Sequence, residues 1–226
     1  MEGAKSVIEL IESDFVIELL LATDEFQQKY STILSKHTSI TETVTLNELQ
    51  SVGTFQTNDS CLAIAKIKPN ELLERLDGEF VLVLDNVRDP GNLGAIIRIA
   101  DWYGVKKVIC STDTTDWYNP KVIAASKGSF TRIKSFYTDL PLYFKGHTEN
   151  DFIAGAFLDG GSVYNYPFEA KGGFIVMGNE SNGISDEVGK YITDRLTIPR
   201  IGEAESLNVG IATAIIMDNL RRIQQG

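Results

Sequence analysis

The chain has 226 residues, of which 43% are hydrophobic and 23% charged, as in an ordinary globular protein with one large domain or two modest ones. Its formal net charge of −10 argues against broad nonspecific binding to a polyanion, and no apolar run approaches the ~20 residues that a membrane helix needs. The opening residues, "MEGAKSVIEL", show no secretory signal, so we expect a cytoplasmic protein that does not enter a membrane.

Cysteine and histidine are scarce. The two cysteines, Cys61 and Cys110, are too few for a disulfide framework and lack the spacing of a zinc site, so we expect buried thiols. The two histidines, His37 and His147, have no carboxylate or cysteine neighbours at ligand spacing. The sequence therefore predicts neither a metal site nor a Ser-His-Asp triad.

The first third of the chain predicts a small α/β module. Apolar residues recur at helical spacing in "AKSVIELIES", and Thr23 or Asp24 is a plausible cap for a helix in "TDEFQQKYSTILSKH". Two apolar segments, "FVIELLLA" and "CLAIAKI", are typical of strands. Residues 1–60 carry ten acidic and three basic side chains, so the module is strongly acidic. We place this first domain at residues 1–70.

A polar connector, "KPNELLERLDGE", leads to a second domain, which we place at residues 78–226. Its apolar segments show no clear polar alternation and are separated by helical patterns, which predicts an α/β fold with a parallel sheet covered on both faces. Sheets of this kind bind ligands beyond the carboxyl ends of their strands. The expected strands are "FVLVL", "KKVIC", "FIAGAF", "GFIVMG" and "LTIP", with helices after the first strand, around 119–127, after Ser185 and from about 207.

The first strand runs into "DNVRDPGNLGAIIRIADWYGV", residues 85–105. A Pro-Gly turn followed by Asn92 predicts a helix capped by Asn92, with free amides at its positive end. On this helix Arg98 shares its side with Asp101. The arginine is therefore either solvated, paired with Asp101, or available to a ligand.

Two later loops also follow apolar strands. In "GFIVMGNESNGIS", Glu180 lies between Gly178 and Gly183, and it either accepts hydrogen bonds from a ligand or braces a tight loop. In "LTIPRIGEAESLNVGIATAIIMDNLRR", Ser206 is the expected cap of the last helix and Asn208 lies in its first turn. Small residues in that helix predict tight packing, within the chain or against another subunit.

A local basic stretch interrupts the acidic chain between residues 121 and 134, which hold no acidic side chain. The stretch is either a solvated face or a patch that contacts phosphates. Its members are Lys121, Lys127, Arg132 and Lys134.

Three segments, "NVRDPGNLGAIIR", "VMGNESNG" and "IPRIGEAESLNVGIATAI", resemble in order and spacing the motifs of the SpoU (TrmH) family of SPOUT-class RNA methyltransferases. The resemblance covers residues 80–226. The first third is similar in layout to the L30e-like module that binds RNA substrate in many members. The resemblance implies transfer of a methyl group from S-adenosylmethionine to a ribose 2′-hydroxyl, a trefoil knot at the last loop and helix, and a homodimer.

The resemblance also implies roles for individual residues. Polar motif positions expected in catalysis are Asn92, Arg98, Glu180, Ser206 and Asn208; positions expected at the cofactor are Met177, Gly178, Ile198, Leu207 and Asn208. Arg98 is expected to contact the 2′-hydroxyl or its phosphate and to stabilise the developing alkoxide, because a guanidinium is a poor base.

Ribosomal RNA, in particular 23S rRNA, is the expected substrate because the L30e-like module accompanies many ribosomal members. The alternatives are a tRNA 2′-O-methyltransferase and a noncatalytic RNA-binding or ribosome-assembly protein that retains the knot. A nicotinamide-dependent dehydrogenase is disfavoured, since the first strand is not followed by G-x-G-x-x-G.

Overall fold

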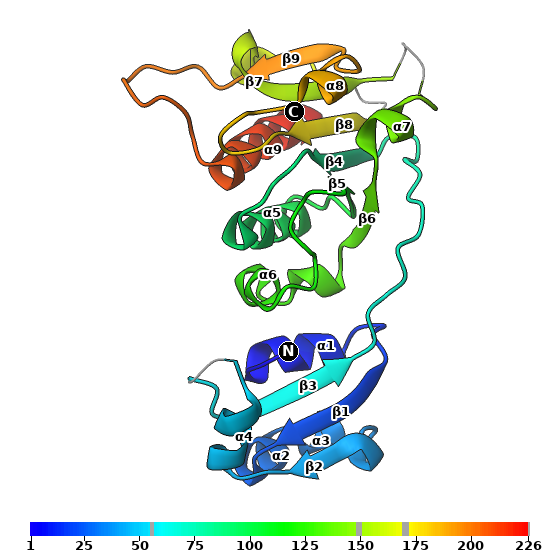
Figure 1. Cartoon of the computed structure of the whole chain (residues 1–226), viewed down its shortest axis with the longest axis vertical. Helices are drawn as coiled ribbons and strands as arrows, with labels where there is room; N and C mark the ends of the chain where they lie inside the picture. Colours follow the sequence, from blue (N-terminus) through cyan, green and yellow to red (C-terminus); the bar gives the residue numbers. More distant parts are fainter. Residues whose placement is uncertain (55–56, 148–150, 169–171, 226) are drawn as a thin grey trace.

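The structure is a computed structural model that describes residues 1–54, 57–147, 151–168 and 172–225. It contains two β-sheets, one in the first third of the chain and one in the remainder (Figure 1). The first sheet has the strand order β2-β1-β3, and the second has the order β6-β5-β4-β8-β7-β9. None of the helices within these described ranges is long and apolar enough to cross a membrane.

The first sheet is mixed, because β1 pairs parallel with β2 and antiparallel with β3. Its elements are α1 (Ala4–Ile11), β1 (Ile17–Ala22), α2 (Asp24–Lys29), α3 (Ser31–Leu34), β2 (Thr41–Thr43), α4 (Leu46–Val52) and β3 (Cys61–Ala65). Thr23 caps α2 as expected, since its side chain accepts a hydrogen bond from the Phe26 amide. The helix expected over residues 23–37 is divided at Tyr30, while β2 and α4 were not predicted.

The second sheet is parallel throughout, which confirms the predicted α/β class. Its elements are β4 (Phe80–Leu84), α5 (Pro90–Trp102), β5 (Lys107–Ser111), α6 (Pro120–Ser126), β6 (Lys134–Thr138), α7 (Leu140–Phe144), β7 (Ile153–Ser162), β8 (Gly173–Met177), α8 (Asp186–Gly189), β9 (Asp194–Thr197) and α9 (Val209–Gln225). Strand β6 and helix α7 were not predicted. Strand β6 lies at the edge of the sheet and has no fully buried residue, so it lacks the apolar run that marks the central strands.

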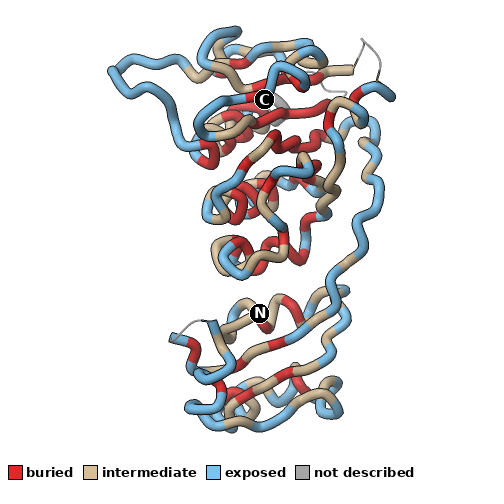
Figure 2. The backbone as a smooth tube through the Cα atoms, in the orientation of Figure 1, coloured by how far each residue is buried: buried red, intermediate tan, exposed pale blue. Residues whose placement is uncertain are grey.

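Both faces of the parallel sheet are covered. Leu82 and Leu84 belong to the apolar cluster that includes α5 and α9, whereas Val81 and Val83 belong to the cluster that includes α7 and α8. Successive side chains of a strand point to opposite faces, so every residue of β4 is buried (Figure 2). This two-sided burial explains why the central strands show no polar alternation.

Helix α5 packs closely against α6 and α9. A side chain at Gly94 would bring its Cβ within 2.4 Å of the Ala125 Cβ on α6, so glycine sets how near the two helices lie. The amino end of α9 meets α5 near Ala95, since a Cβ at Gly210 would lie 3.6 Å from the Ala95 Cβ. The small residues of α9 therefore serve packing within the chain, and the knot at this helix stays a prediction.

The two sheets are joined by a connector that runs along one side of the molecule (Figure 1). Asn70 in this connector exchanges two hydrogen bonds with the backbone of Tyr137 in β6, at 2.9 and 2.8 Å. Near the first sheet, Phe15 packs on Phe130 and Tyr118 of the second part, with ring centroids 5.6 and 6.2 Å apart. The first third of the chain is therefore packed against the α6 region.

Candidate functional site

Helix α5 begins at Pro90, and its cap is Asp89. The Asp89 carboxylate accepts a hydrogen bond from the Asn92 amide at 2.8 Å. The prediction that Asn92 caps this helix is wrong, because proline occupies the first helical position and the cap must precede it. Asn92 is instead the third residue of α5, and its side chain is left to contact other loops.

The turn between β4 and α5 ties three strand ends together through Asn86, which has the left-handed φ of 61°. Its amide donates to the Ser111 hydroxyl after β5 at 2.8 Å, and its carbonyl accepts from the Asn179 side chain after β8 at 2.7 Å. A left-handed conformation is costly for a residue with a side chain, so it persists where the surroundings fix it. These contacts define a rigid floor at the carboxyl edge of β4, β5 and β8.

The loop after β8 folds back tightly on the strand end. A Cβ at Gly178 would lie 2.2 Å from the Gly183 carbonyl carbon, so only glycine fits there. The Asn179 side chain accepts from the Ser181 and Asn182 amides at 2.9 and 3.1 Å, while the buried Asp85 carboxylate accepts from the Ser185 amide at 2.7 Å. The loop is thus braced by Asn179 and Asp85, which leaves the exposed Glu180 side chain for other contacts.

A chain of side-chain hydrogen bonds connects the three loops. The Asn208 side-chain NH2 group donates to Oδ1 of Asn92 at 2.8 Å, and the Asn92 side-chain NH2 group donates to the Glu180 carboxylate at 2.8 Å. The structure therefore brings Asn92, Glu180 and Asn208 together, although they are separated by as many as 116 positions along the chain.

Asn208 also caps helix α9. Its side-chain oxygen accepts from the Gly210 and Ile211 amides at 2.9 and 3.3 Å. The prediction that Ser206 is the cap is wrong, and Ser206 lies exposed in the preceding loop. Because the Asn208 oxygen is occupied by backbone amides, its NH2 group must be the donor to Asn92, which in turn must donate to Glu180. The backbone amides at the start of α9 therefore fix the donor and acceptor roles in this whole series of hydrogen bonds.

Arg98 is exposed on α5, six residues after Asn92. Asp101, its expected alternative partner, is bound to Arg132 instead, with the Nε–Oδ2 distance at 2.9 Å. Within the described residues no carboxylate or other acceptor contacts the Arg98 guanidinium. The structure therefore contradicts the alternative in which Arg98 pairs with Asp101, while a solvated Arg98 and an Arg98 that contacts a ligand both remain predictions.

The residues expected at the cofactor lie around the same edge. Met177 is buried at the end of β8, Gly178 and Ile198 are half-buried, and Leu207 is 48% exposed beside Asn208. The exposed loop between β9 and α9 projects from the molecule (Figure 1). Because Gly178 has no side chain, a ligand can lie along the backbone at this strand end. The nearby amide and carboxylate groups can then bind polar groups of that ligand.

The basic stretch is divided by the fold. Lys121 lies at the start of α6, and this start of the helix is on the side of the carboxyl edge of the sheet. Lys134 is the first residue of β6, so it lies toward the amino edge. Lys127 is the left-handed residue that ends α6. These three side chains are exposed, but Arg132 is held by carboxylates.

Two other features of the described residues differ from this site. No group of three His, Cys, Asp or Glu side chains in those residues could hold a metal ion. A hollow of about 580 Å³ lies between the connector and α7, and Arg75, Tyr143 and His147 are among its lining residues. None of the predicted site residues lines it.

The known proteins that this chain resembles are RNA methyltransferases. The model of the "SpoU rRNA Methylase family" matches residues 79–218. The chain is 29% identical to the 23S rRNA (guanosine(2553)-2'-O)-methyltransferase RlmP of Bacillus subtilis, over 98% of this chain and 87% of that protein.

Two solved structures superpose on most of the chain. A TrmH-family protein from Porphyromonas gingivalis has a TM-score of 0.85 and 32% identity, and the match covers 98% of this chain and 88% of that one. An AdoMet-bound rRNA methyltransferase from Sinorhizobium meliloti has a TM-score of 0.86 and 26% identity, over 98% and 86%.

Proposed function

Because this chain belongs to the SpoU rRNA methylase family, we propose that it transfers a methyl group from S-adenosylmethionine to a ribose 2′-hydroxyl of 23S ribosomal RNA. The observation that carries the proposal is the chain of hydrogen bonds from Asn208 through Asn92 to Glu180, which joins the three family motifs at one edge of the sheet. A noncatalytic protein that only retained the fold would not need this polar connection.

S-Adenosylmethionine, when bound, supplies a methyl group on a positively charged sulfur that is already a good leaving group. The protein's part is therefore to align the groups and to ease loss of the hydroxyl proton. The backbone of Gly178, Ile198 and Leu207 would hold the cofactor, with Met177 and Asn208 beside it. Glu180 and Ser206 would contact its polar groups or those of the substrate.

Arg98 would contact the 2′-hydroxyl or its neighbouring phosphate. A guanidinium has a pKa above ~12, so it stabilises the developing alkoxide by donating hydrogen bonds rather than by acting as the base. Its exposure on α5 and its lack of a partner among the described residues support this assignment.

We infer that residues 1–70 act as an L30e-like RNA-binding domain and residues 78–226 as the catalytic domain. The exposed Lys121, Lys127 and Lys134 would contribute phosphate contacts, which any RNA substrate requires. Since this substrate would be ribosomal RNA, the protein would act in the cytoplasm. A homodimer through α5 and α9 would complete the site.

The test is the substitution Arg98→Ala. Methyl transfer to 23S rRNA from cells that lack the protein should fall by about a hundredfold or more, as on removal of an oxyanion-stabilising donor. The affinity for S-adenosylmethionine, measured by calorimetry, should change by less than about twofold, because Arg98 is assigned to the RNA. Lys145→Ala removes an exposed cation from the opposite face of the sheet and serves as the control. Normal turnover by Arg98→Ala would remove this arginine from the mechanism.

A further inference from the structure

Helix α5 carries an acidic residue where it could disable Arg98. Residues three apart on a helix are neighbours on its surface, so Asp101 is within reach of the Arg98 side chain. Arg98 can meet a substrate only while it does not pair with this carboxylate. The state of Asp101 therefore bears directly on the site.

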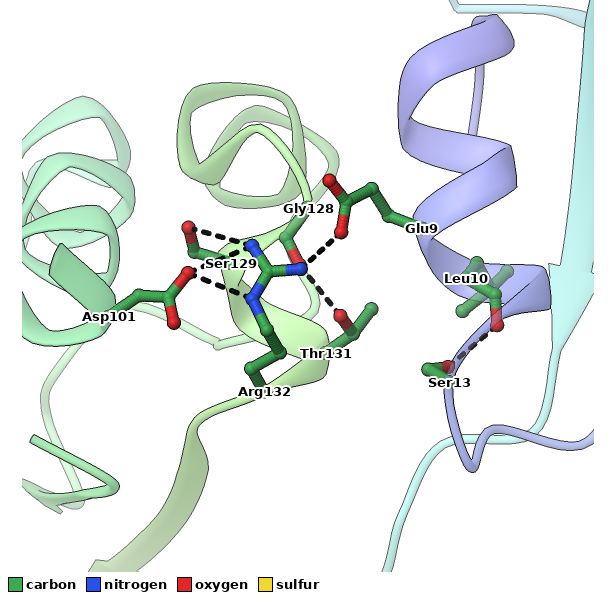
Figure 3. Close-up of polar contacts among 8 residues, drawn as sticks. All are labelled: Glu9, Leu10, Ser13, Asp101, Gly128, Ser129, Thr131 and Arg132. Carbon is green, nitrogen blue, oxygen red and sulfur yellow. Dashed lines mark hydrogen bonds and ion pairs between the residues drawn. The ribbon is translucent and has the colours of Figure 1, made fainter. Parts of the chain in front are cut away.

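Asp101 is occupied by Arg132, which follows the short helical turn Ser129–Thr131. The Arg132 Nε and Nη2 atoms both approach the Oδ2 atom of Asp101, at 2.9 and 2.8 Å, so one carboxylate oxygen faces two nitrogens of the guanidinium (Figure 3). Contacts between a guanidinium and a carboxylate are charge-assisted, so they are stronger than hydrogen bonds between neutral groups. The Asp101 side chain is 18% exposed, so its carboxylate is partly withdrawn from water. A nearby cation stabilises the charge of such a carboxylate.

The same guanidinium reaches across to the first third of the chain. Arg132 Nη1 contacts the Glu9 carboxylate on α1 (Figure 3). Hydrogen bonds to both carboxylates, that to Asp101 foremost, raise the pKa of Arg132 above its ordinary value. Arg132 is therefore a bridge between Glu9 and α5, and it is not a free member of the basic stretch.

The approach of Glu9 is built into the fold. Gly128 has a φ of 93°, and a Cβ there would lie 2.7 Å from the Glu9 Cγ. Phe15, just after α1, packs on Phe130 at 5.6 Å between ring centroids. Helix α1 is thus seated so that its carboxylate meets Arg132.

We propose that Arg132 is a positioning residue for methyl transfer, because it occupies the Asp101 carboxylate and thereby keeps Arg98 unpaired and available to the substrate. Glu9 holds Arg132 in this position, so the first third of the chain takes part in keeping Arg98 available. This inference rests on the role proposed for Arg98. It differs from the expectation that Arg132 contacts RNA phosphate.

The test is a double-mutant cycle read as kcat at saturating RNA. Arg132→Met should lower kcat about two- to fivefold, because the released Asp101 pairs with Arg98 with the strength of a partly exposed ion pair. In the Asp101→Asn background the same substitution should lower kcat by less than about 1.5-fold, since there is no carboxylate left to pair. Arg132→Lys, which keeps a cation beside Asp101, should retain most of the rate.

Three controls separate the explanations. Thermal melting of each variant detects a loss of folding, and the comparison of Arg132→Met with Arg132→Lys stays informative if the former is unstable. Lys145→Met removes an exposed positive charge elsewhere and should leave kcat unchanged. Glu9→Gln should lower kcat slightly and, like Arg132→Met, lose its effect in the Asp101→Asn background.

The outcomes distinguish this inference from the proposed function. If kcat falls equally in both Asp101 backgrounds, the positioning role is overturned and Arg132 is assigned to structure. If kcat is unchanged and only the KM for RNA rises, Arg132 is assigned to phosphate contact instead. Full kcat in Arg132→Met beside an inactive Arg98→Ala would overturn this inference alone. Activity of Arg98→Ala would overturn the role of Arg98, on which the inference depends.

Discussion

At the level of single residues, the direction of the hydrogen bonds determines what the site can offer. The backbone of α9 fixes the Asn208 amide, which fixes Asn92, which presents an NH2 group to Glu180. Glu180 is then an acceptor in this contact, and its exposed carboxylate has further lone pairs that can accept hydrogen bonds. A ligand that contacts Glu180 therefore has to donate hydrogen bonds to it, as hydroxyl and amino groups do.

We predict that Asn92→Asp lowers kcat/KM by about 10- to 100-fold, because a hydrogen bond to a charged group is replaced by repulsion between two carboxylates. Its effect on stability should be small, since an acidic residue in the first turn of a helix is favoured by the helix dipole. Methyl-transfer kinetics and urea unfolding measure the two quantities. A variant with full activity would show that the link between Asn92 and Glu180 has no catalytic consequence.

The residues of the site were predictable to the extent that their motifs resemble those of known proteins. Likeness singled out Asn92, Glu180 and Asn208, which the structure brings together. It did not single out Asp85 or Asn179, whose hydrogen-bond partners lie 100 and 93 positions away in the chain. Local patterns contain no information on such pairings. The two caps were misassigned because "DPGN" and "SLN" each offer two good capping residues. In "DPGN" the preference of proline for the first helical position favours Asp89, whereas in "SLN" only the backbone decides.

At the level of elements, α5 combines two requirements. One side of α5 is buried against the sheet and its neighbours and consists of Leu93, Ile96, Ile97 and Ala100, while Arg98 and Trp102 face outward.

The central strands were predictable because burial on both faces imposes a continuous apolar run. The edge strand β6 and the short β2 were not, because an exposed edge imposes no such pattern.

The close contact between α5 and α6 gives a prediction at this level. Gly→Ala normally stabilises a helix by up to about 1 kcal/mol, but at Gly94 the new methyl group would lie 2.4 Å from the Ala125 Cβ. We expect Gly94→Ala to destabilise the protein by about 1–3 kcal/mol, as in other overpacked interiors.

Urea unfolding measures this change. Gly189→Ala in α8 is the matched control, because its added methyl meets no atom within 4 Å and should be close to neutral. The double substitution Gly94→Ala with Ala125→Gly should recover part of the loss. A Gly94→Ala variant as stable as the parent would show that α6 can move away from α5 at little cost.

At the level of the whole molecule, the acidic first third is joined to the second part by contacts that use its charge. Residues 1–60 carry ten acidic and three basic side chains. One of these acidic side chains, Glu9, forms an ion pair with Arg132, and Phe15 packs on Phe130. Pairing across two segments more than a hundred positions apart depends on how the domains pack, which composition does not specify.

The outward face of α5 and α9 supports a dimer. Trp102 is 84% exposed and Ile211 is 54% exposed, and the two helices lie side by side, joined also by the 2.7 Å hydrogen bond from Arg221 to the Tyr103 carbonyl. Large apolar side chains exposed on adjacent helices are typical of a surface that binds a partner. In a two-fold dimer the same patch would serve both copies.

We predict that the protein sediments at micromolar concentration as a species of about twice its 25.0 kDa mass, and that Trp102→Glu shifts it to the monomer because a charge would be buried at the interface. Leu158→Glu, at a similarly exposed apolar residue on β7, should leave the dimer intact. Since Trp102 shares its side of α5 with Arg98, the monomeric variant should also lose methyl transfer. A parent protein that is already monomeric would contradict the dimer, and an active Trp102→Glu monomer would show that one chain holds the complete site.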